Sequence, residues 1–154
     1  MDILCDIDGT IADLSHRRHW IASKPKNYKA FFGSVSLDTP IKPVIETVKR
    51  LHRGGATIIF CSGRPERTRD DTITWLRTHI PCLVGQMEPH NFLSPLYMRK
   101  DHDFRADDIV KSELLDRIYA DGHNPIIAFD DRQRVVNMWR ARGIVCAQVA
   151  EGDF

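Results

Sequence analysis

The chain lacks the sequence features that mark membrane and secreted proteins. No apolar run among its 154 residues approaches the roughly 20 residues that a membrane-spanning helix needs. The N-terminal residues do not form a basic segment followed by an apolar stretch, so we expect no secretion signal and a cytoplasmic location. No Cys-x-x-Cys pair occurs. We therefore expect buried free thiols, rather than disulfides or zinc ligands, at Cys5, Cys61, Cys82 and Cys146.

Glutamate and lysine are scarce as well. Aspartate outnumbers glutamate 16 to 5, and arginine outnumbers lysine 15 to 7. Short carboxylates suit metal sites and the guanidinium group suits phosphate, so this bias hints at phosphate chemistry; a genomic preference for arginine would explain it equally well. The net charge of +1 gives no support for a long basic surface that binds nucleic acid.

The length fits one domain, residues 1–154, in which short apolar runs alternate with helical patterns. The apolar runs predict buried strands at 3–7, 57–61, 96–98, 125–129 and 144–149. The helical patterns predict helices at 43–53, 66–79, 132–142 and from Asp107 or Asp108, as the cap, to near Gly122. This order predicts an α/β fold with a Rossmann-like, doubly wound, mainly parallel sheet.

Polar clusters follow three of the predicted strands at the point where each strand ends. They are Asp6-x-Asp8, Ser62-Gly63-Arg64 and Asp130-Asp131. In doubly wound sheets the ligand lies at the carboxyl ends of the strands, so we expect the three clusters to form one site.

The first cluster suits acid–base and nucleophilic chemistry. In an extended strand the side chains of Asp6 and Asp8 point to the same side, about 6.5 Å apart at the backbone. One carboxylate could act as a nucleophile and the other as an acid and base, which would require its pKa to rise from about 3.9. An Asx turn followed by Gly9 is the simpler alternative.

The other two clusters suit metal and phosphate. Asp6 and one of Asp130 and Asp131 would supply the oxygen ligands that Mg²⁺ prefers, although a loop with a helix-capping aspartate would look the same. Exposed N–H groups after Ser62, together with Arg64, would receive phosphate oxygens, unless this segment is only a capped helix. Lys111 could neutralise the nucleophile and the phosphate, although a lone lysine usually lies at the surface.

Taken together and in order, the motifs resemble those of the haloacid dehalogenase superfamily, in its phosphohydrolase branch. They are Asp6-x-Asp8-Gly9-Thr10, Ser62, Lys111 and Asp130-Asp131. The resemblance implies that Asp6 attacks phosphorus to form an aspartyl-phosphate and that Asp8 protonates the leaving oxygen and then activates water. It further implies that Mg²⁺ is bound by Asp6, the Asp8 carbonyl, Asp130 and Asp131, and that phosphate is held by Ser62, Lys111, Thr10 and Gly63.

A more specific resemblance covers most of the chain. Several segments resemble the phosphatase domain of bacteriophage polynucleotide kinase-phosphatase. They are Arg17, the regions around Ser62, Lys111 and Asp130, Met138-Trp139-Arg140, and the ending from Val149 to Phe154. That family removes 3′-phosphates from nucleic-acid ends in repair. The resemblance implies that Arg17, Arg64 and Asp107 contact the substrate or orient Lys111.

The chain departs from that family in two ways. It has no Gly-x-x-x-x-Gly-Lys-[Ser/Thr] loop, so we expect no kinase domain and no kinase activity. Residues 13–42 form an insert that we expect to be a small helical lid over an open site. Its basic and aromatic residues could stack a base and meet a phosphate backbone, or could pack as an ordinary helical hairpin.

Other functions remain open at this stage. A 5′-(deoxy)nucleoside monophosphate phosphatase is the main enzymatic alternative, and a protein that binds nucleic-acid ends without turnover is the non-enzymatic one. A signalling receiver would carry its acidic pair after the first strand and its phosphate acceptor on a middle strand, which is the reverse of the order here.

Overall fold

A central parallel sheet organises the molecule in a computed structural model that describes residues 1–22, 24–84 and 94–152. Its strand order is β5-β4-β1-β6-β7, and every neighbouring pair is parallel. The strands are β1 (Asp2–Cys5), β4 (Thr57–Pro65), β5 (Leu96–Arg99), β6 (Pro125–Arg132) and β7 (Val145–Gly152). The predicted α/β, Rossmann-like parallel architecture is confirmed.

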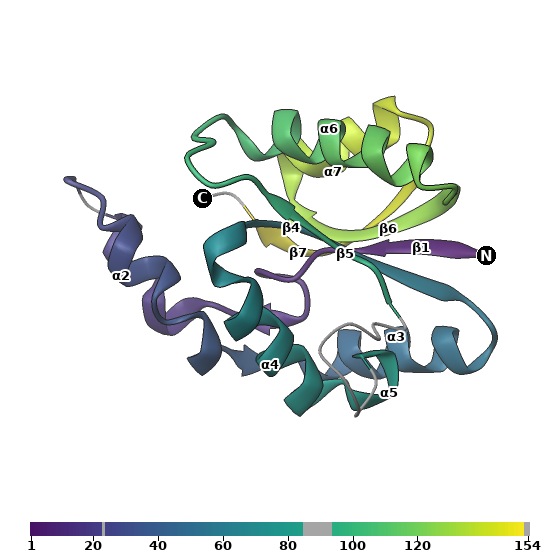
Figure 1. Ribbon diagram of the computed structural model, residues 1–154, viewed down its shortest axis with the longest axis horizontal. Helices are drawn as coiled ribbons and strands as arrows, with labels where there is room; N and C mark the ends of the chain where they lie inside the picture. Colours follow the sequence, from purple (N-terminus) through teal and green to yellow (C-terminus); the bar gives the residue numbers. More distant parts are fainter. Residues whose placement is uncertain (23, 85–93, 153–154) are drawn as a thin grey trace.

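Helices cover both faces of this sheet (Figure 1). On one face lie α3 (Lys42–Arg53), α4 (Arg69–His79), which follows the short helix η3 (Glu66–Thr68), and α5 (Pro81–Val84). On the other face lie α6 (Asp107–Ala120) and α7 (Gln133–Ala141). Among the described residues, no helix is both long and apolar enough to cross a membrane.

Alternation along β1 explains why the core has two halves. Successive strand side chains point to opposite faces, so Ile3 and Cys5 pack on the α3 and α4 side while Leu4 packs on the α6 and α7 side. Each half contains one fully buried tryptophan, Trp75 of α4 or Trp139 of α7. Because both faces are covered, the central strands contain continuous apolar runs, as is usual for parallel sheets.

Three expectations about local structure were wrong. Cys82 is exposed instead of buried, because the short helix α5 buries Leu83 and Val84. Asp107 does not cap α6: the N-cap is Ala106, without a side-chain hydrogen bond, and Asp107 lies in the first turn. β4 and β6 also extend beyond their apolar runs, because Pro65 and Arg132 still pair with the neighbouring strands β5 and β7. These polar extensions carry Ser62 and Asp130 as parts of strands rather than as loops.

The insert, residues 13–42, projects from the carboxyl edge of the sheet, at the left of Figure 1. Antiparallel pairing of β2 (Ala12–Asp13) with β3 (Thr39–Pro40) closes it at the base. Between them lie η1 (Ser15–Arg17), α1 (His19–Ala22), α2 (Tyr28–Phe32) and η2 (Val35–Leu37). The last two residues of the family-like ending, Asp153 and Phe154, fall outside the described residues.

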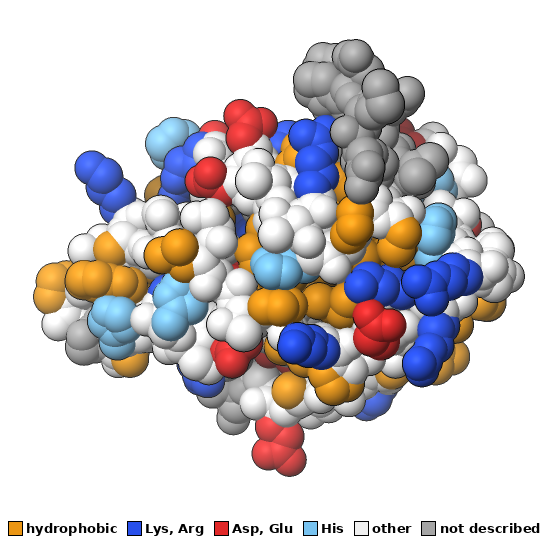
Figure 2. All heavy atoms as spheres, turned by 90° about the horizontal axis from the view of Figure 1, so that it is seen from below, with side chains coloured by type: hydrophobic (Ala, Val, Ile, Leu, Met, Phe, Trp, Pro, Cys, Tyr) orange, Lys and Arg blue, Asp and Glu red, His pale blue; other side chains and the backbone are white. Residues whose placement is uncertain are grey.

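Figure 2 shows the face that carries α3, α4 and α5. Lys and Arg side chains lie there among acidic and hydrophobic ones instead of forming a single basic stripe. The described side chains of this face therefore form no continuous basic track for a nucleic-acid backbone, in agreement with the net charge of +1.

Candidate active site

Lys111 joins two of the predicted acidic clusters at the carboxyl ends of β1 and β6. Its Nζ lies 2.7 Å from Asp6 Oδ1 and 2.8 Å from Asp130 Oδ2, and all three side chains are buried. The Asp6 backbone N–H donates to the carbonyl of Phe129 at 3.0 Å, which fixes β1 against β6 at this point. Thr10 Oγ1 lies 3.4 Å from Asp6 Oδ2, so one carboxylate contacts both a lysine and a hydroxyl.

Three buried carboxylates form a group that suits a divalent cation. Asp6, Asp130 and Asp131 each place one oxygen within 4.8 Å of the others. Burial raises the pKa of Asp6 well above its usual range, and Asp130 and Asp131 add to the rise against the opposing charge of Lys111. One lysine cannot balance three buried carboxylates, and an all-oxygen donor set is what Mg²⁺ prefers. The residues present therefore fit a magnesium ion.

Asp130 and Asp131 have different surroundings. Both carboxylate oxygens of Asp130 accept hydrogen bonds. Its Oδ2 accepts from Lys111 and from Trp139 Nε1 at 3.1 Å, and its Oδ1 accepts from the Arg132 N–H at 3.2 Å. Asp131 instead lies between Gly9 and Gly152, where a Cβ at either position would overlap its Oδ2. Burial and the Asp130 charge raise the pKa of Asp131 to about 6.

Asp8 lies between two buried arginines. Arg17 Nη2 donates to its Oδ1 at 2.8 Å, and Arg64 donates to the same oxygen from Nε at 2.8 Å and Nη2 at 2.6 Å. Burial alone would raise the pKa of Asp8, but the charges of Arg64 and Arg17 outweigh it and lower this pKa. The expectation of a raised pKa at Asp8 is therefore wrong for the ligand-free protein. Among the described residues, no hydrogen bond ends on Oδ2.

Asp38, near the end of the insert, binds both Arg17 and Arg64 through its carboxylate. Its fully buried carboxylate accepts from Arg17 Nε and Nη2, each at 2.7 Å, and from Arg64 Nη2 at 2.6 Å. His16 Nε2 lies 2.8 Å from Asp38 Oδ1, and Trp75 Nε1 donates to the Asp38 carbonyl at 2.7 Å. Two carboxylates and two guanidinium groups thus form a neutral buried network that ties the insert to the sheet.

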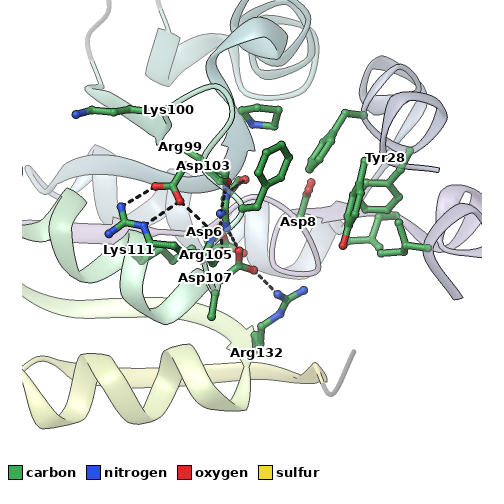
Figure 3. A pocket seen from close by; sticks show the side chains of 18 of the residues that line it. Asp6, Asp8, Tyr28, Arg99, Lys100, Asp103, Arg105, Asp107, Lys111 and Arg132 are labelled. Carbon is green, nitrogen blue, oxygen red and sulfur yellow. Dashed lines mark hydrogen bonds and ion pairs between the residues drawn. The ribbon is translucent and has the colours of Figure 1, made fainter. Parts of the chain in front are cut away.

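A cavity of about 340 Å³ opens above these groups, between the insert and the segment that leads into α6 (Figure 3). Seven of the sequence-predicted site residues line it: Asp6, Asp8, Gly63, Asp107, Lys111, Asp130 and Asp131. The other four are fully buried and do not line it: Thr10, Arg17, Ser62 and Arg64. The Ser62 hydroxyl accepts from the Arg64 N–H at 3.2 Å, so it supports the turn that carries Arg64.

Asp107 organises the wall of the cavity rather than pairing with Lys111. Its carboxylate contacts Arg99 Nη2 and Arg132 Nη1, both of which line the cavity (Figure 3). Gly63 permits this approach, because a Cβ there would lie 3.1 Å from Asp107 Oδ1. The two arginines place positive charge near the three carboxylates.

Some of these residues carry little sequence signal. Asp38 is an isolated aspartate in an irregular stretch, and nothing in its neighbourhood indicates that it meets Arg17 and Arg64. Arg132 adjoins the Asp130-Asp131 motif, so proximity to that motif was the one available clue. Phe104, which also lines the cavity, lies in a segment without a clear pattern.

The chain is similar to known proteins along nearly its whole length. Residues 1–154 match the family described as the polynucleotide kinase PNKP phosphatase domain. Over 139 residues the chain is 30% identical to a protein of Autographa californica nuclear polyhedrosis virus that is predicted to be a bifunctional polynucleotide kinase/RNA ligase. This match covers 90% of the chain and 17% of the viral protein.

Solved structures share the fold along nearly the whole chain. Chains from two structures of the Pnkp1/Rnl/Hen1 complex, one titled an RNA repair complex, match 99% of this chain with a TM-score of 0.77. They are 28% and 29% identical, and the match covers 43% and 46% of their length. A class C acid phosphatase from Bacillus anthracis shares the fold at 15% identity, with a TM-score of 0.66 over 99% of this chain and 67% of that one. The chain thus spans less than half of the Pnkp1/Rnl/Hen1 chains it matches.

Proposed function

Because the chain belongs to the family of polynucleotide kinase PNKP phosphatase domains, and is therefore a phosphatase of the haloacid dehalogenase superfamily, we propose that it removes the 3′-phosphate from nucleic-acid ends. The proposed reaction depends on Mg²⁺ and passes through an aspartyl-phosphate, the acyl phosphate of Asp6. The observation that carries the proposal is that Asp6, Asp8, Lys111 and the carboxylates of Asp130 and Asp131 line one cavity.

The acidic group would hold the metal through Asp6 and Asp131. Asp130 is already engaged by Lys111, Trp139 and the Arg132 N–H, so we assign it to positioning Lys111 and to completing the negative charge of the site. Mg²⁺ bound here would supply positive charge for the phosphate oxygens and for the buried carboxylates.

In the first step an Asp6 carboxylate oxygen bonds to phosphorus as the bond from phosphorus to the leaving 3′-oxygen breaks. Asp8 gives its proton to that oxygen from Oδ2, the atom that the two arginines leave open. Asp8 is ionised in the free protein, and the negative charge of an arriving phosphate raises its pKa so that it takes up the proton. Lys111 pairs with Asp6 in the free protein and neutralises the negative charge of the phosphoryl oxygens once Asp6 is bonded to phosphorus.

In the second step Asp8 works as a base. Its Oδ2 accepts a proton from a water molecule, whose oxygen bonds to phosphorus and releases inorganic phosphate from Asp6. We assign Arg17 and Arg64 to positioning Asp8 rather than to contacting the substrate, because both are buried behind it. Thr10 contacts Asp6 directly, and Ser62 supports the Arg64 turn, so we assign both to positioning as well.

The relatives suggest the setting of this activity. The solved chains belong to an RNA repair complex, and the viral relative is predicted to combine a polynucleotide kinase with an RNA ligase. We therefore propose that phosphate removal by this chain prepares nucleic-acid ends for repair.

A substrate comparison tests the function. Purified protein with Mg²⁺ is given four substrates at equal concentration: a 3′-phosphorylated oligonucleotide, a 5′-phosphorylated oligonucleotide, a 3′-mononucleotide and a 5′-mononucleotide. We expect phosphate release to be fastest from the 3′-phosphorylated oligonucleotide. Faster release from the 5′-mononucleotide would overturn the polynucleotide assignment and favour a nucleotidase.

The nucleophile is tested with a matched pair of variants at the two ends of β1. Asp6→Asn, directly after the strand, should abolish phosphate release and the acid-stable phosphoenzyme label. Asp2→Asn, at the first residue of the strand, should retain both. Release by Asp6→Asn at the wild-type rate would refute the role of Asp6.

A further inference from the structure

The most exposed large apolar side chain at the cavity is Phe104, in the segment between β5 and α6. Its ring is 83% exposed, although burying a phenylalanine commonly stabilises a protein by about 1.5–3 kcal/mol. Phe104 lines the cavity that contains Asp6 and Lys111. Its position at this cavity, rather than its exposure alone, makes Phe104 a candidate contact for a ligand.

The backbone on both sides of Phe104 is held firmly. The Arg99 Nη1 donates to the carbonyl of Asp103 at 2.9 Å and to the carbonyl of Arg105 at 2.8 Å. Arg105 also donates to Glu113 of α6, at 2.6 and 2.8 Å. Phe104 is thus an exposed ring on a fixed support, which lowers the entropy lost when a ligand binds to it.

The insert supplies a second aromatic wall. Tyr28 opens α2 with a ring that is 44% exposed and lines the same cavity. It stacks on Phe32, with ring centroids 6.3 Å apart and planes 18° apart. Figure 3 shows Tyr28 on one side of Asp8 and Asp103 and Arg105, the neighbours of Phe104, on the other. Tyr28 and Phe104 thus both line the cavity that contains Asp8.

Positive side chains surround these rings. Lys26 lies over the Tyr28 ring at 6.0 Å from its centroid, and Arg67 lies over the Phe32 ring at 5.6 Å. Lys100, three residues before Asp103, also lines the cavity. Aromatic rings interleaved with cations are the combination that binds single-stranded nucleic acid, with bases stacked and phosphates neutralised.

We propose that Phe104 and Tyr28 hold the base of the terminal nucleotide by stacking, so that the site selects a phosphorylated end that carries a base. This inference rests on the proposed function and adds the feature of the substrate that is recognised. A volume of about 340 Å³ lies at the small end of the range for ligand sites, which suits one terminal nucleotide with the rest of the strand outside.

The test removes the ring and the base in turn. Two 3′-phosphorylated single-stranded oligonucleotides are compared, identical except that the terminal sugar of one lacks a base. We expect wild-type kcat/KM to favour the base-bearing end by about 5- to 150-fold, the range that stacking of one base supplies. Phe104→Ala should lose most of this preference, Phe104→Trp should keep it, and Tyr28→Ala should reduce it.

The controls separate this proposal from the function on which it rests. Tyr119→Ala removes a ring that is 37% exposed on α6 and is not in the cavity lining, so it should keep the wild-type preference. Equal wild-type rates on both oligonucleotides, abolished by Asp6→Asn, would overturn stacking and leave the phosphatase function standing. No phosphate release from either oligonucleotide would overturn both.

Discussion

Asp38 offers the sharpest test of how this site is built, because it touches neither the cavity nor the three metal-site carboxylates. Together with Asp8 it balances the charges of Arg17 and Arg64 in a buried network. The change Asp38→Asn keeps the shape of the side chain and removes its charge, which leaves one buried guanidinium without a compensating carboxylate. Breaking a buried ion pair in this way costs about 3–5 kcal/mol.

Thermal unfolding gives the first measurement. For a domain of this length about 3–5 kcal/mol corresponds to a fall of about 6–20 °C in melting temperature. Asp116→Asn is the matched control, because Asp116 pairs with Arg142 at the exposed surface and should change the melting temperature little. An Asp38→Asn protein as stable as the wild type would show that the buried network contributes nothing to the fold.

Steady-state kinetics gives the second measurement. If the arginines only position Asp8, Asp38→Asn should lower kcat by about 10- to 100-fold, as small misplacements of catalytic groups do, with KM nearly unchanged. A rise in KM as large as the fall in kcat would instead mean that Arg17 and Arg64 contact the substrate. That result would refute the positioning role assigned to them.

Three further predictions concern the metal site and the core. Gly152→Ala places a methyl group against Asp131 Oδ2 and should weaken Mg²⁺ binding at least tenfold by titration calorimetry, with an unchanged circular dichroism spectrum. Because the pKa of Asp131 is raised to about 6, protons compete with the cation below that pH. Mg²⁺ affinity should therefore fall by up to about tenfold per pH unit below pH 6. An affinity that does not change with pH would contradict the assignment of Asp131 as a metal ligand. Leu115→Ala should lower the free energy of unfolding by about 2–5 kcal/mol in urea titrations, and Leu37→Ala, at an exposed position, should change it far less.

Sequence patterns were most successful where local chemistry dictates structure. Apolar runs located the strands, and the 3.6-residue spacing of Trp75 and Trp139 with their neighbours located two helices. An apolar residue alone does not show which side of a helix is buried: Ile109 is exposed on α6, whereas Leu114 of the same helix is buried. Near helix ends a small rotation decides which side faces the sheet, and no local signal fixes that rotation.

In the site, too, local patterns predicted some features and missed others. The motif residues Asp6, Lys111 and Asp131 converge because parallel strands bring their carboxyl ends to one edge, so their meeting followed from strand order. The pKa of Asp8 did not follow: a carboxylate beside another carboxylate is expected to have a raised pKa, but two buried arginines distant in sequence lower it. Charge interactions act through space, so arginines far from Asp8 in the chain decided the direction of its pKa shift.

By itself the sequence determined the α/β architecture and the order of the polar motifs along the chain, because each depends on periodicity or on spacing of a few residues. Only the tertiary structure decided that Arg17 and Arg64 are buried beside Asp8 and do not line the cavity, that Asp38 anchors them, and that Phe104 and Tyr28 line the same cavity. These arrangements join the insert, β4 and the segment before α6, which are distant along the chain. The physical reason is that burial and electrostatic balance are properties of the packed molecule.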